Sequence, residues 1–393
     1  MRLLLNVSSL QAPLTGIGRY TLNLTSSLLK SGRVSEVTGF SAAGLLGPAE
    51  VERLLQSLDT EAKQSRPVSG DRSGLRALVA SLPGARFAYR NMREFNLRRQ
   101  FQQLREHVYW EPNYLIAHDD FASVVTLHDV SHLRYPEFHP ATRIKEMGRV
   151  LPRTLSAATR LNVVSEFTCR EVVEYFNPKQ PIDIVPPGVG EEFFNVSADE
   201  VARCKEKFNL PHEFVLSVST LEPRKNLARL VDAYEQLPEA LREKYPLVLA
   251  GATGWHASPI ENSLRRLVEK KQAIILGYVE QPMLPALYAA ATLTAYVSVY
   301  EGFGMPIVES MAAGTPVLTS NVTSMPEVSG KYAALVPPDN VAEIASALEH
   351  CLSNPDRLIS MSQAGVARAR EFSWESAALK LFESLEMAKD AHG

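Results

Sequence analysis

Four charged side chains stand where short apolar runs give way to helix-like segments. Arg224 and Lys225 follow the apolar run 214–219, and Glu301 and Glu309 follow another. An arginine fork and a lysine point charge side by side predict binding of a pair of phosphates. Ionised carboxylates only accept hydrogen bonds, which suits them to sugar hydroxyls. Ordinary surface charges remain the alternative interpretation for all four.

The segment between the two glutamates adds backbone groups. Gly302, Phe303, Gly304 and Met305 form a glycine-bearing turn before a helix-like segment with Pro306 in its first turn, where proline is tolerated. Amide groups at a helix start favour anions and other oxygen ligands. We therefore expect these amides to point toward a ligand.

Two further motifs follow strand-like runs in the first half of the chain. Gly16 and Gly18 let the backbone approach a ligand closely, although a plain strand-to-helix turn is the alternative. Thr21 stands at the third glycine position of a dinucleotide fingerprint, which argues against a nicotinamide-dependent oxidoreductase. His128 ends the run 123–127, where it could contact a substrate hydroxyl, or could be structural.

Short apolar runs without strict alternation are separated by helix-length segments along the whole chain. This pattern is typical of parallel sheets covered by helices on both faces. Because the rhythm restarts after about residue 190, we predict an α/β fold of two doubly wound Rossmann-like domains facing a cleft, 1–187 and 188–372. The segment 373–393 carries a last helix without a following strand. The predicted strands are 2–7, 123–127, 161–165, 182–185, 214–219, 247–251, 273–279, 293–299, 316–319 and 333–336.

Composition narrows the class of protein. The 393 residues carry a net charge of −3, which is not the strongly basic footprint of a nucleic-acid binder. The three cysteines form no close pair, so we expect neither a disulfide framework nor a structural zinc site. The longest weakly polar run, 286–300, is too short to span a membrane. These features predict a soluble, cytoplasmic protein.

One basic segment, Arg72 to Arg105, holds eight arginines and a single acidic residue, Glu94. It predicts peripheral contact with the anionic inner face of the cytoplasmic membrane, or a grip on a diphosphate-linked lipid. A solvated face is the alternative. The arginines are Arg72, Arg76, Arg86, Arg90, Arg93, Arg98, Arg99 and Arg105.

In combination, these motifs resemble the retaining GT-B glycosyltransferases of family four (group 1). The Glu-seven residues-Glu element is only moderately specific by itself, but with Glu-Pro-Arg-Lys-Asn at 222–226 upstream it is a strong signature. The resemblance covers nearly the whole chain. Further matching segments are 15–20, 125–136, 164–167, 185–188 and 310–317.

The resemblance implies a role for each catalytic candidate. Arg224 and Lys225 would hold the diphosphate of a nucleotide sugar and stabilise the leaving group. Glu301 would bond hydroxyls of the transferred sugar. His128, from the N-terminal domain, would reach the donor sugar. The last helix would cross back onto the N-terminal domain.

The donor-binding candidates follow in the same way. Glu309 would bond the nucleotide ribose, and the amides of Phe303, Gly304 and Met305, after Gly302, would lie beside the sugar. Gly16 and Gly18 would lie next to the diphosphate. No Asp-x-Asp occurs in the chain, so we expect a transferase that needs neither metal nor cofactor.

The variable segment 127–140 is most similar to bacterial mannosyl- and rhamnosyltransferases of lipopolysaccharide O-antigen synthesis. The resemblance thus implies transfer of mannose or a deoxyhexose from a GDP-sugar to a lipid-linked saccharide. A non-catalytic nucleotide-sugar-binding partner subunit is the alternative. The intact Arg224, Lys225, Glu301 and Glu309 argue against it.

Overall fold

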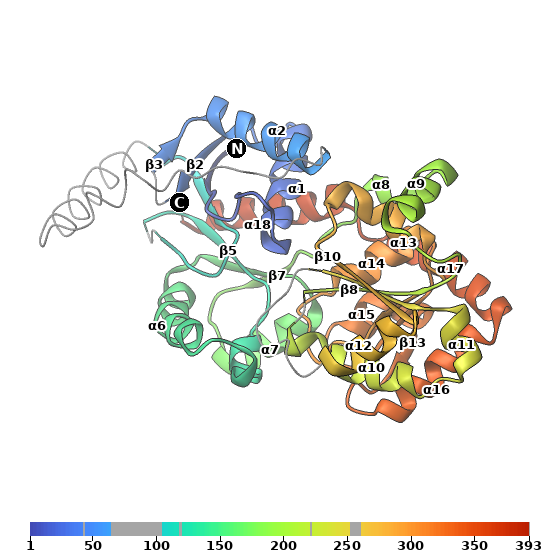
Figure 1. Ribbon diagram of the computed structural model, residues 1–393. Coiled ribbons are helices and arrows are strands. Elements are labelled where there is room, and N and C mark those ends of the chain that lie inside the picture. The colour runs from blue at the N-terminus through green and yellow to red at the C-terminus, as the bar shows by residue number, and fades with distance from the viewer. Residues whose placement is uncertain (42–43, 64–103, 118–119, 221, 252–260, 393) are drawn as a thin grey trace, which may run out of the picture.

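The chain forms two α/β units, each built on one sheet (Figure 1). The structure, a computed structural model, describes residues 1–41, 44–63, 104–117, 120–220, 222–251 and 261–392. In both sheets every neighbouring pair of strands is parallel except β2 with β3. The predicted fold class, two doubly wound sheets, is confirmed.

The N-terminal sheet has seven strands in the order β3-β2-β1-β4-β5-β6-β7. Its strand order reverses between β1 and β4, whose carboxyl ends therefore flank a switch point, the place where doubly wound folds bind ligands. The bounds are β1 (Arg2–Asn6), β2 (Glu36–Ser41), β3 (Gly44–Leu46), β4 (Val108–Glu111), β5 (Ser123–Leu127), β6 (Arg160–Val163) and β7 (Ile182–Ile184).

Helices cover both faces of this sheet. Buried side chains of α1 and α2 share one core with the first strand, and those of α6 and α7 belong to a second core on the opposite face. Because each strand is covered on both sides, its side chains are apolar in both directions. The helices are α1 (Gly16–Lys30), α2 (Pro48–Lys63), α5 (Ser131–Arg134), α6 (Ala141–Ala157) and α7 (Glu166–Phe176).

The C-terminal sheet has six strands in the order β10-β9-β8-β11-β12-β13, with its own switch point between β8 and β11. The strands are β8 (Val215–Val218), β9 (Leu247–Ala250), β10 (Ala273–Gly277), β11 (Leu293–Tyr296), β12 (Val317–Ser320) and β13 (Ala334–Val336). Its helices are α8 (Glu191–Phe194), α9 (Ala198–Phe208), α10 (Leu227–Glu235), α11 (Glu239–Lys244), α12 (Glu261–Glu269), α13 (Leu284–Ala290), α14 (Met305–Ala312), α15 (Met325–Ser329), α16 (Val341–Leu352) and α17 (Pro355–Ala369).

The last helix, α18 (Trp374–His392), packs against α1 and against strands β4 to β7 of the N-terminal unit. Its Ser384 hydroxyl donates to Asp183 Oδ2 at 2.6 Å. Where the chain passes between the units, the Val189 amide donates to the Phe372 carbonyl at 3.0 Å, so the two crossing segments run side by side. These crossings lie next to the domain boundaries that we propose at 187/188 and 372/373.

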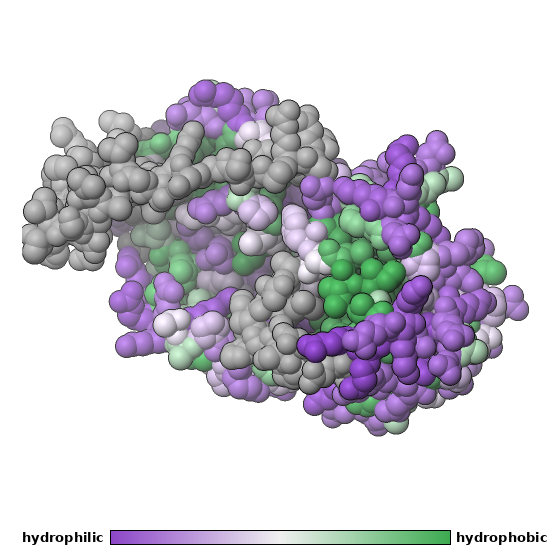
Figure 2. All heavy atoms as spheres, in the orientation of Figure 1, coloured by the Kyte–Doolittle hydropathy of each residue, from purple (hydrophilic) through white to green (hydrophobic). Residues whose placement is uncertain are grey.

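The ten predicted strands are present, each within a few residues of its predicted bounds, and the structure adds β2, β3 and β4. Among the described residues, no helix combines the length and the apolar character needed to cross a membrane. Figure 2 shows a mostly hydrophilic visible face, with hydrophobic residues gathered on the C-terminal unit beside its boundary with the N-terminal unit.

Candidate active site

The predicted cations lie at the carboxyl edge of the C-terminal sheet, at its switch point. Arg224 and Lys225 stand on a short 3-10 helix that follows β8. Asn226 ends that helix with a φ of 59° and donates through Nδ2 to the carbonyl oxygens of Val297 (2.9 Å) and Pro338 (2.6 Å). These bonds tie the loop after β8 to the loops after β11 and β13, so the residues on these loops are held together.

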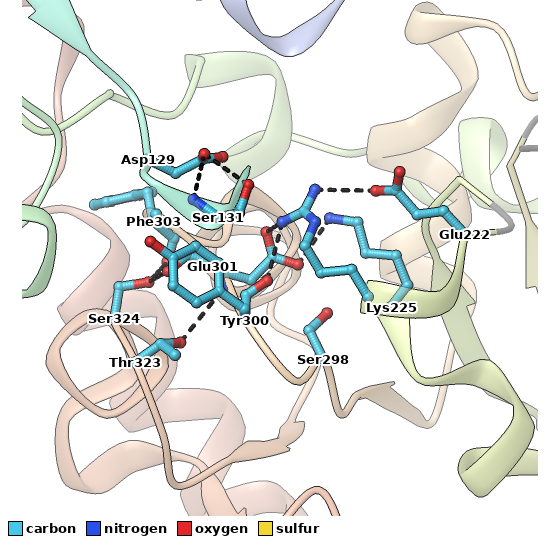
Figure 3. A network of polar contacts seen from close by, with 12 residues as sticks. Asp129, Ser131, Glu222, Lys225, Ser298, Tyr300, Glu301, Phe303, Thr323 and Ser324 are labelled. Carbon is cyan, nitrogen blue, oxygen red and sulfur yellow. Dashed lines mark hydrogen bonds and ion pairs between the residues drawn. The ribbon is translucent and has the colours of Figure 1, made fainter. Parts of the chain in front are cut away.

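Glu301, in the loop after β11, accepts hydrogen bonds from both cations (Figure 3). Arg224 Nη1 lies 2.9 Å from its Oε2, and Lys225 Nζ lies 2.7 Å from its Oε1. The Tyr296 hydroxyl donates to the same Oε1 at 2.6 Å. Arg224 Nη2 also donates to Glu222 Oε1 at 2.9 Å. We call Arg224, Lys225, Glu301, Tyr296 and Glu222 the ion cluster.

Burial makes the charges of the ion cluster interdependent. Glu301 is only 6% exposed. Burial disfavours its ionisation, but the positive charges of Arg224 and Lys225 outweigh burial and lower its pKa to about 2. Burial and the neighbouring Arg224 lower the pKa of Lys225, while Glu301 favours its charged form. The two cations of the cluster are therefore paired with the carboxylates of Glu301 and Glu222.

Asp129 of the N-terminal unit adds a further charge near Arg224. Its Oδ1 accepts from the amide (3.0 Å) and the hydroxyl (2.8 Å) of Ser131. Burial disfavours ionisation of Asp129, but Arg224 and the Ser131 hydrogen bonds prevail and lower its pKa. Both units thus contribute ionised groups to the same site (Figure 3).

The turn after Glu301 presents backbone donors. Gly304 precedes α14 with a φ of 103°, a left-handed conformation that favours glycine. Among the described residues, the amides of Gly302, Phe303, Gly304 and Met305 have no hydrogen-bond acceptor. Such amides at a helix start can donate to the oxygens of a bound anion or sugar.

Glu309 lies in the second turn of α14 and is 7% exposed. The Tyr288 hydroxyl donates to its Oε2 at 3.0 Å. Burial raises the pKa of Glu309, and the positive charge of Arg19 on α1 offsets this only in part. Glu309 therefore forms a second polar group, separate from the ion cluster and facing the start of α1.

The two glycines at the start of α1 differ in their surroundings. A Cβ on Gly18 would lie 2.6 Å from the Ser9 carbonyl and 2.9 Å from Leu14, so packing against its own loop requires a glycine here. A Cβ on Gly16 would meet nothing within 4 Å. Thr15 caps the helix by accepting from the Gly18 amide at 3.2 Å. Of the pair, only Gly16 borders open space.

His128 follows β5, and its backbone carbonyl packs against the C-terminal unit. A Cβ on Gly302 would lie 1.9 Å from the His128 carbonyl oxygen. The His128 ring packs edge-on against Tyr20, and Nε2 lies 2.8 Å from the Pro112 carbonyl. Because a carbonyl only accepts, Nε2 carries a proton, and burial lowers the pKa of the ring. A neutral His128 would then offer Nδ1 as an acceptor.

The comparisons with known proteins match both halves of the chain. The family model of Glycosyltransferase Family 4 matches residues 14–193, and that of Glycosyl transferases group 1 matches 199–368. The O-antigen chain mannosyltransferase B of Escherichia coli is 32% identical over 378 residues, covering 96% of this chain and 97% of the relative. The chain belongs to the group 1 glycosyltransferases.

Two further comparisons place the glycosyltransferase among known relatives. The serotype-specific mannosyltransferase WbdA of Escherichia coli is 34% identical over 228 residues, covering 56% of this chain and 28% of WbdA. The solved structure of the Anabaena protein HepE in complex with UDP-glucose superposes with a TM-score of 0.69 at 18% identity, covering 98% of this chain and 99% of HepE. The predicted family, the predicted GT-B fold and the predicted class of enzyme, a hexosyltransferase, are confirmed.

Some residues of the candidate site escape sequence reasoning. Asp129 directly follows His128 and Glu222 directly precedes Pro223, so both stand inside recognised motifs without being singled out. Tyr296 lies in an apolar strand, where a buried phenol looks like core. Glu222 and Tyr296 lie two and five residues from their partners Arg224 and Glu301, but these two partners are themselves 77 positions apart, so spacing alone does not reveal the cluster.

The arginine-rich segment lies mostly outside the described residues, which resume at residue 104. Within the described ranges, no group of three or more His, Cys, Asp or Glu side chains could hold a metal ion. Membrane contact and metal independence therefore both stay predictions from the sequence.

Proposed function

We propose that this glycosyltransferase moves mannose, or a deoxyhexose, from a GDP-sugar to a lipid-linked saccharide during synthesis of a surface polysaccharide such as the O-antigen, with retention of anomeric configuration. One observation carries the proposal: a buried pair of cations, held by a carboxylate at a sheet switch point, in a chain similar over nearly its full length to an O-antigen chain mannosyltransferase.

The donor would lie along the carboxyl edge of the C-terminal sheet. Arg224 and Lys225 would exchange part of their bonding to Glu301 for the diphosphate. Glu309 would accept hydrogen bonds from the nucleotide ribose. The amides of Phe303 and Gly304 and the freed Glu301 oxygens would bond the hydroxyls of the sugar. His128 and Gly16 would approach the donor from the N-terminal unit.

The reaction would break the bond between the sugar C1 and the diphosphate oxygen and form a bond from C1 to the acceptor oxygen. Negative charge grows on the leaving diphosphate, and Arg224, Lys225 and the α14 amides would stabilise it as preorganised electrostatics. Positioning directs the acceptor hydroxyl to the same face of the sugar. Its proton leaves with the nucleoside diphosphate. No residue proposed here requires a metal ion.

The test is nucleotide release by the purified chain from GDP-mannose, GDP-rhamnose, GDP-fucose and UDP-glucose, with octyl α-mannoside as acceptor probe, in buffer and in EDTA. We expect release from a GDP-sugar, unchanged by EDTA, and an α-linked product by NMR. Release only from UDP-glucose would overturn the donor assignment. Loss in EDTA that manganese or magnesium restores would overturn metal independence. Nucleotide binding without release from any donor would favour a non-catalytic partner subunit.

The proposed membrane contact has a separate test. Because it rests on the charge of the segment 72–105, replacing Arg90, Arg93, Arg98 and Arg99 by Ser should abolish sedimentation with anionic liposomes while leaving donor turnover in solution intact. Equal sedimentation of the variant and the wild type would refute membrane contact through this segment.

A further inference from the structure

The two residues on either side of Glu301 are held by the opposite unit. The Tyr300 hydroxyl donates to Glu171 Oε2 at 2.8 Å and accepts from the Val130 amide at 3.2 Å. The Gly302 carbonyl accepts from two hydroxyls of the N-terminal unit, described next. The Glu301 side chain itself bonds to Arg224, Lys225 and Tyr296 of the C-terminal unit. The loop that carries the carboxylate is therefore fixed on both flanks by the N-terminal unit.

The hydrogen bonds to the Gly302 carbonyl come from two fully buried hydroxyl groups. Ser165 Oγ lies 2.6 Å and Thr168 Oγ1 lies 3.1 Å from the Gly302 carbonyl oxygen, and both hydroxyl residues are 0% exposed. Hydrogen bonds buried in this way are costly to leave unmade. The backbone of His128 packs so closely on the other side that a Cβ at Gly302 has no room. The peptide after Glu301 therefore has one permitted position in this arrangement of the units.

Glu327 of α15, in the C-terminal unit, accepts hydrogen bonds from backbone amides of the N-terminal unit. Its Oε1 accepts from the Glu166 amide at 2.8 Å, and its Oε2 accepts from the Phe167 amide at 3.0 Å. These are the first two amides of α7, which have no partner within their own helix. A carboxylate from the C-terminal unit thus caps a helix of the N-terminal unit, next to the hydroxyls that hold Gly302.

We propose that Ser165, Thr168 and Glu327, acting on the Gly302 carbonyl and the first turn of α7, are positioning residues for transfer. We call these contacts the interdomain latch. Through the latch, contact between the units sets the peptide that follows Glu301, and with it the direction of the carboxylate and of the amides of Phe303 and Gly304. The inference rests on the proposed function, since it assigns these residues to the same reaction.

The latch separates binding from turnover. Arg224, Lys225 and Glu309 lie wholly in the C-terminal unit, so a nucleotide can bind them whether or not the latch is closed. The orientation of Glu301 and of the loop amides, in contrast, depends on both units. Loss of latch bonds should therefore lower kcat and leave the Kd for GDP unchanged, whereas a general loss of folding would weaken both.

Thr168→Val is the sharpest variant because it keeps the shape of the side chain and removes only the hydroxyl. We expect at least a tenfold fall in kcat for GDP release from GDP-mannose, a Kd for GDP within twofold of wild type by calorimetry, and recovery of kcat in Thr168→Ser. Glu327→Gln should behave like Thr168→Val with a smaller fall, because one amide acceptor remains.

Ser165→Ala needs a matched control, because Ser165 also caps α7 by accepting from the Thr168 amide at 3.0 Å. Ser197 caps α9 in the same way, at the exposed start of a helix without contact to the latch. Ser197→Ala should leave kcat unchanged, while Ser165→Ala lowers it at least tenfold. Equal kcat in the two variants would overturn the latch, as would a Kd for GDP that rises in step with the fall in kcat.

Small-angle X-ray scattering of the ligand-free proteins gives a readout that does not need activity. Ser165→Ala/Thr168→Val should have a larger radius of gyration than wild type and Ser197→Ala, since the units separate more readily. If the wild type releases no nucleotide from any donor, the proposed function fails, but this comparison still decides the latch. An unchanged radius of gyration in the double variant would then overturn it.

Discussion

The switch points of the two sheets each carry a buried glutamate, and the two glutamates behave in opposite ways. Glu111 ends β4 beside β1 and is 1% exposed; Glu301 follows β11 beside β8 and is 6% exposed. Burial raises the pKa of Glu111 to about 7, although three hydrogen bonds oppose it. The same burial acts on Glu301, yet its cationic neighbours lower its pKa to about 2.

The difference lies in the partners. Glu111 accepts from Asn6 Nδ2 (2.7 Å), the Tyr109 hydroxyl (2.6 Å) and the Asn113 amide (3.0 Å), all of them neutral. Glu301 accepts from an arginine and a lysine. Two carboxyl groups that are both nearly fully buried thus differ: one is easily protonated and the other stays ionised. The switch point of the C-terminal sheet is therefore organised around charge, as the proposed diphosphate site requires, whereas Glu111 at the switch point of the N-terminal sheet has only neutral partners.

The largest effect should come from removing a cation at the charged edge. Lys225→Ala, and likewise Arg224→Ala, should lower kcat for nucleotide release about 100- to 1000-fold, because a leaving diphosphate would lose preorganised counter-charge. Initial rates with GDP-mannose measure this. Lys207→Ala removes an exposed lysine of the same unit and serves as the control, since it should have wild-type rates. Near-wild-type rates in both cation variants would contradict the assignment.

Glu301→Gln should have the next largest effect and should separate turnover from binding. The amide keeps the shape of the side chain but cannot bond sugar hydroxyls as a charged acceptor, so we expect kcat to fall about 10- to 100-fold. Because Arg224 and Lys225 lose a competing anion, the Kd for GDP should stay equal or decrease. Calorimetry with GDP beside initial rates tests this, and a higher Kd would contradict the exchange of partners that we propose.

Glu309→Ala should raise the Kd for GDP about tenfold, because it removes a hydrogen bond to a charged group, and it should have a smaller effect on kcat. Calorimetric titration with GDP is the measurement. Glu343→Ala, at the exposed start of α16, is the control and should bind GDP like wild type. If the Glu309 variant binds GDP as tightly as this control, the ribose assignment fails.

The smallest effect concerns Glu111, and it appears as a dependence of the stability of the folded state on pH. Folding raises the pKa of Glu111 from 4.5 to about 7. Between these two pH values the Glu111 carboxyl is protonated in the folded state and ionised in the unfolded state. Stability is therefore fully present below that window and falls by about 3 kcal/mol as pH rises through it. Glu111→Gln cannot ionise and lacks this loss.

Thermal unfolding at pH 5 and pH 8 measures the difference between the two proteins. The quantity compared is the midpoint of Glu111→Gln minus the midpoint of wild type at the same pH. This difference should be several degrees larger at pH 8 than at pH 5, whether it is positive or negative at pH 5. Glu106→Gln, an exposed change in the same unit, is the control. A midpoint difference that is constant with pH would mean that Glu111 is ionised in the folded protein, and the comparison of the two edges would fail.

The charged residues around Glu301 could be predicted from the sequence, and the buried Glu111 could not. Arg224, Lys225 and Glu301 stand in motifs with a definite spacing after apolar runs, so their type and position are visible in one dimension. Glu111 ends a four-residue strand, Val-Tyr-Trp-Glu, that begins three residues after the arginine-rich segment and lacks an aliphatic run. Strand β2, with Glu, Thr, Gly and Ser among its six residues, escapes for the same reason.

The interdomain contacts were beyond prediction for a different reason. Glu327 and Glu166 are 161 positions apart, and Ser165 and Gly302 are 137 apart. No periodicity or spacing relates residues on two separate sheets. The apolar runs predict the strands of each sheet, because a strand that is buried on both faces needs apolar residues along its whole length. Which loops meet across the cleft depends on how the finished units pack.

The most direct test of the central claim is thermal unfolding of wild type and Lys225→Ala with GDP, UDP, dTDP and ADP in turn. A ligand at 100 times its Kd adds about 2.7 kcal/mol to the stability of the folded state. We predict a clear rise of the wild-type midpoint with GDP, little change with the other three, and a much smaller rise in Lys225→Ala at the same GDP concentration. A wild type that responds to none of the four, or a variant that responds as strongly as wild type, would contradict a diphosphate site built on the ion cluster.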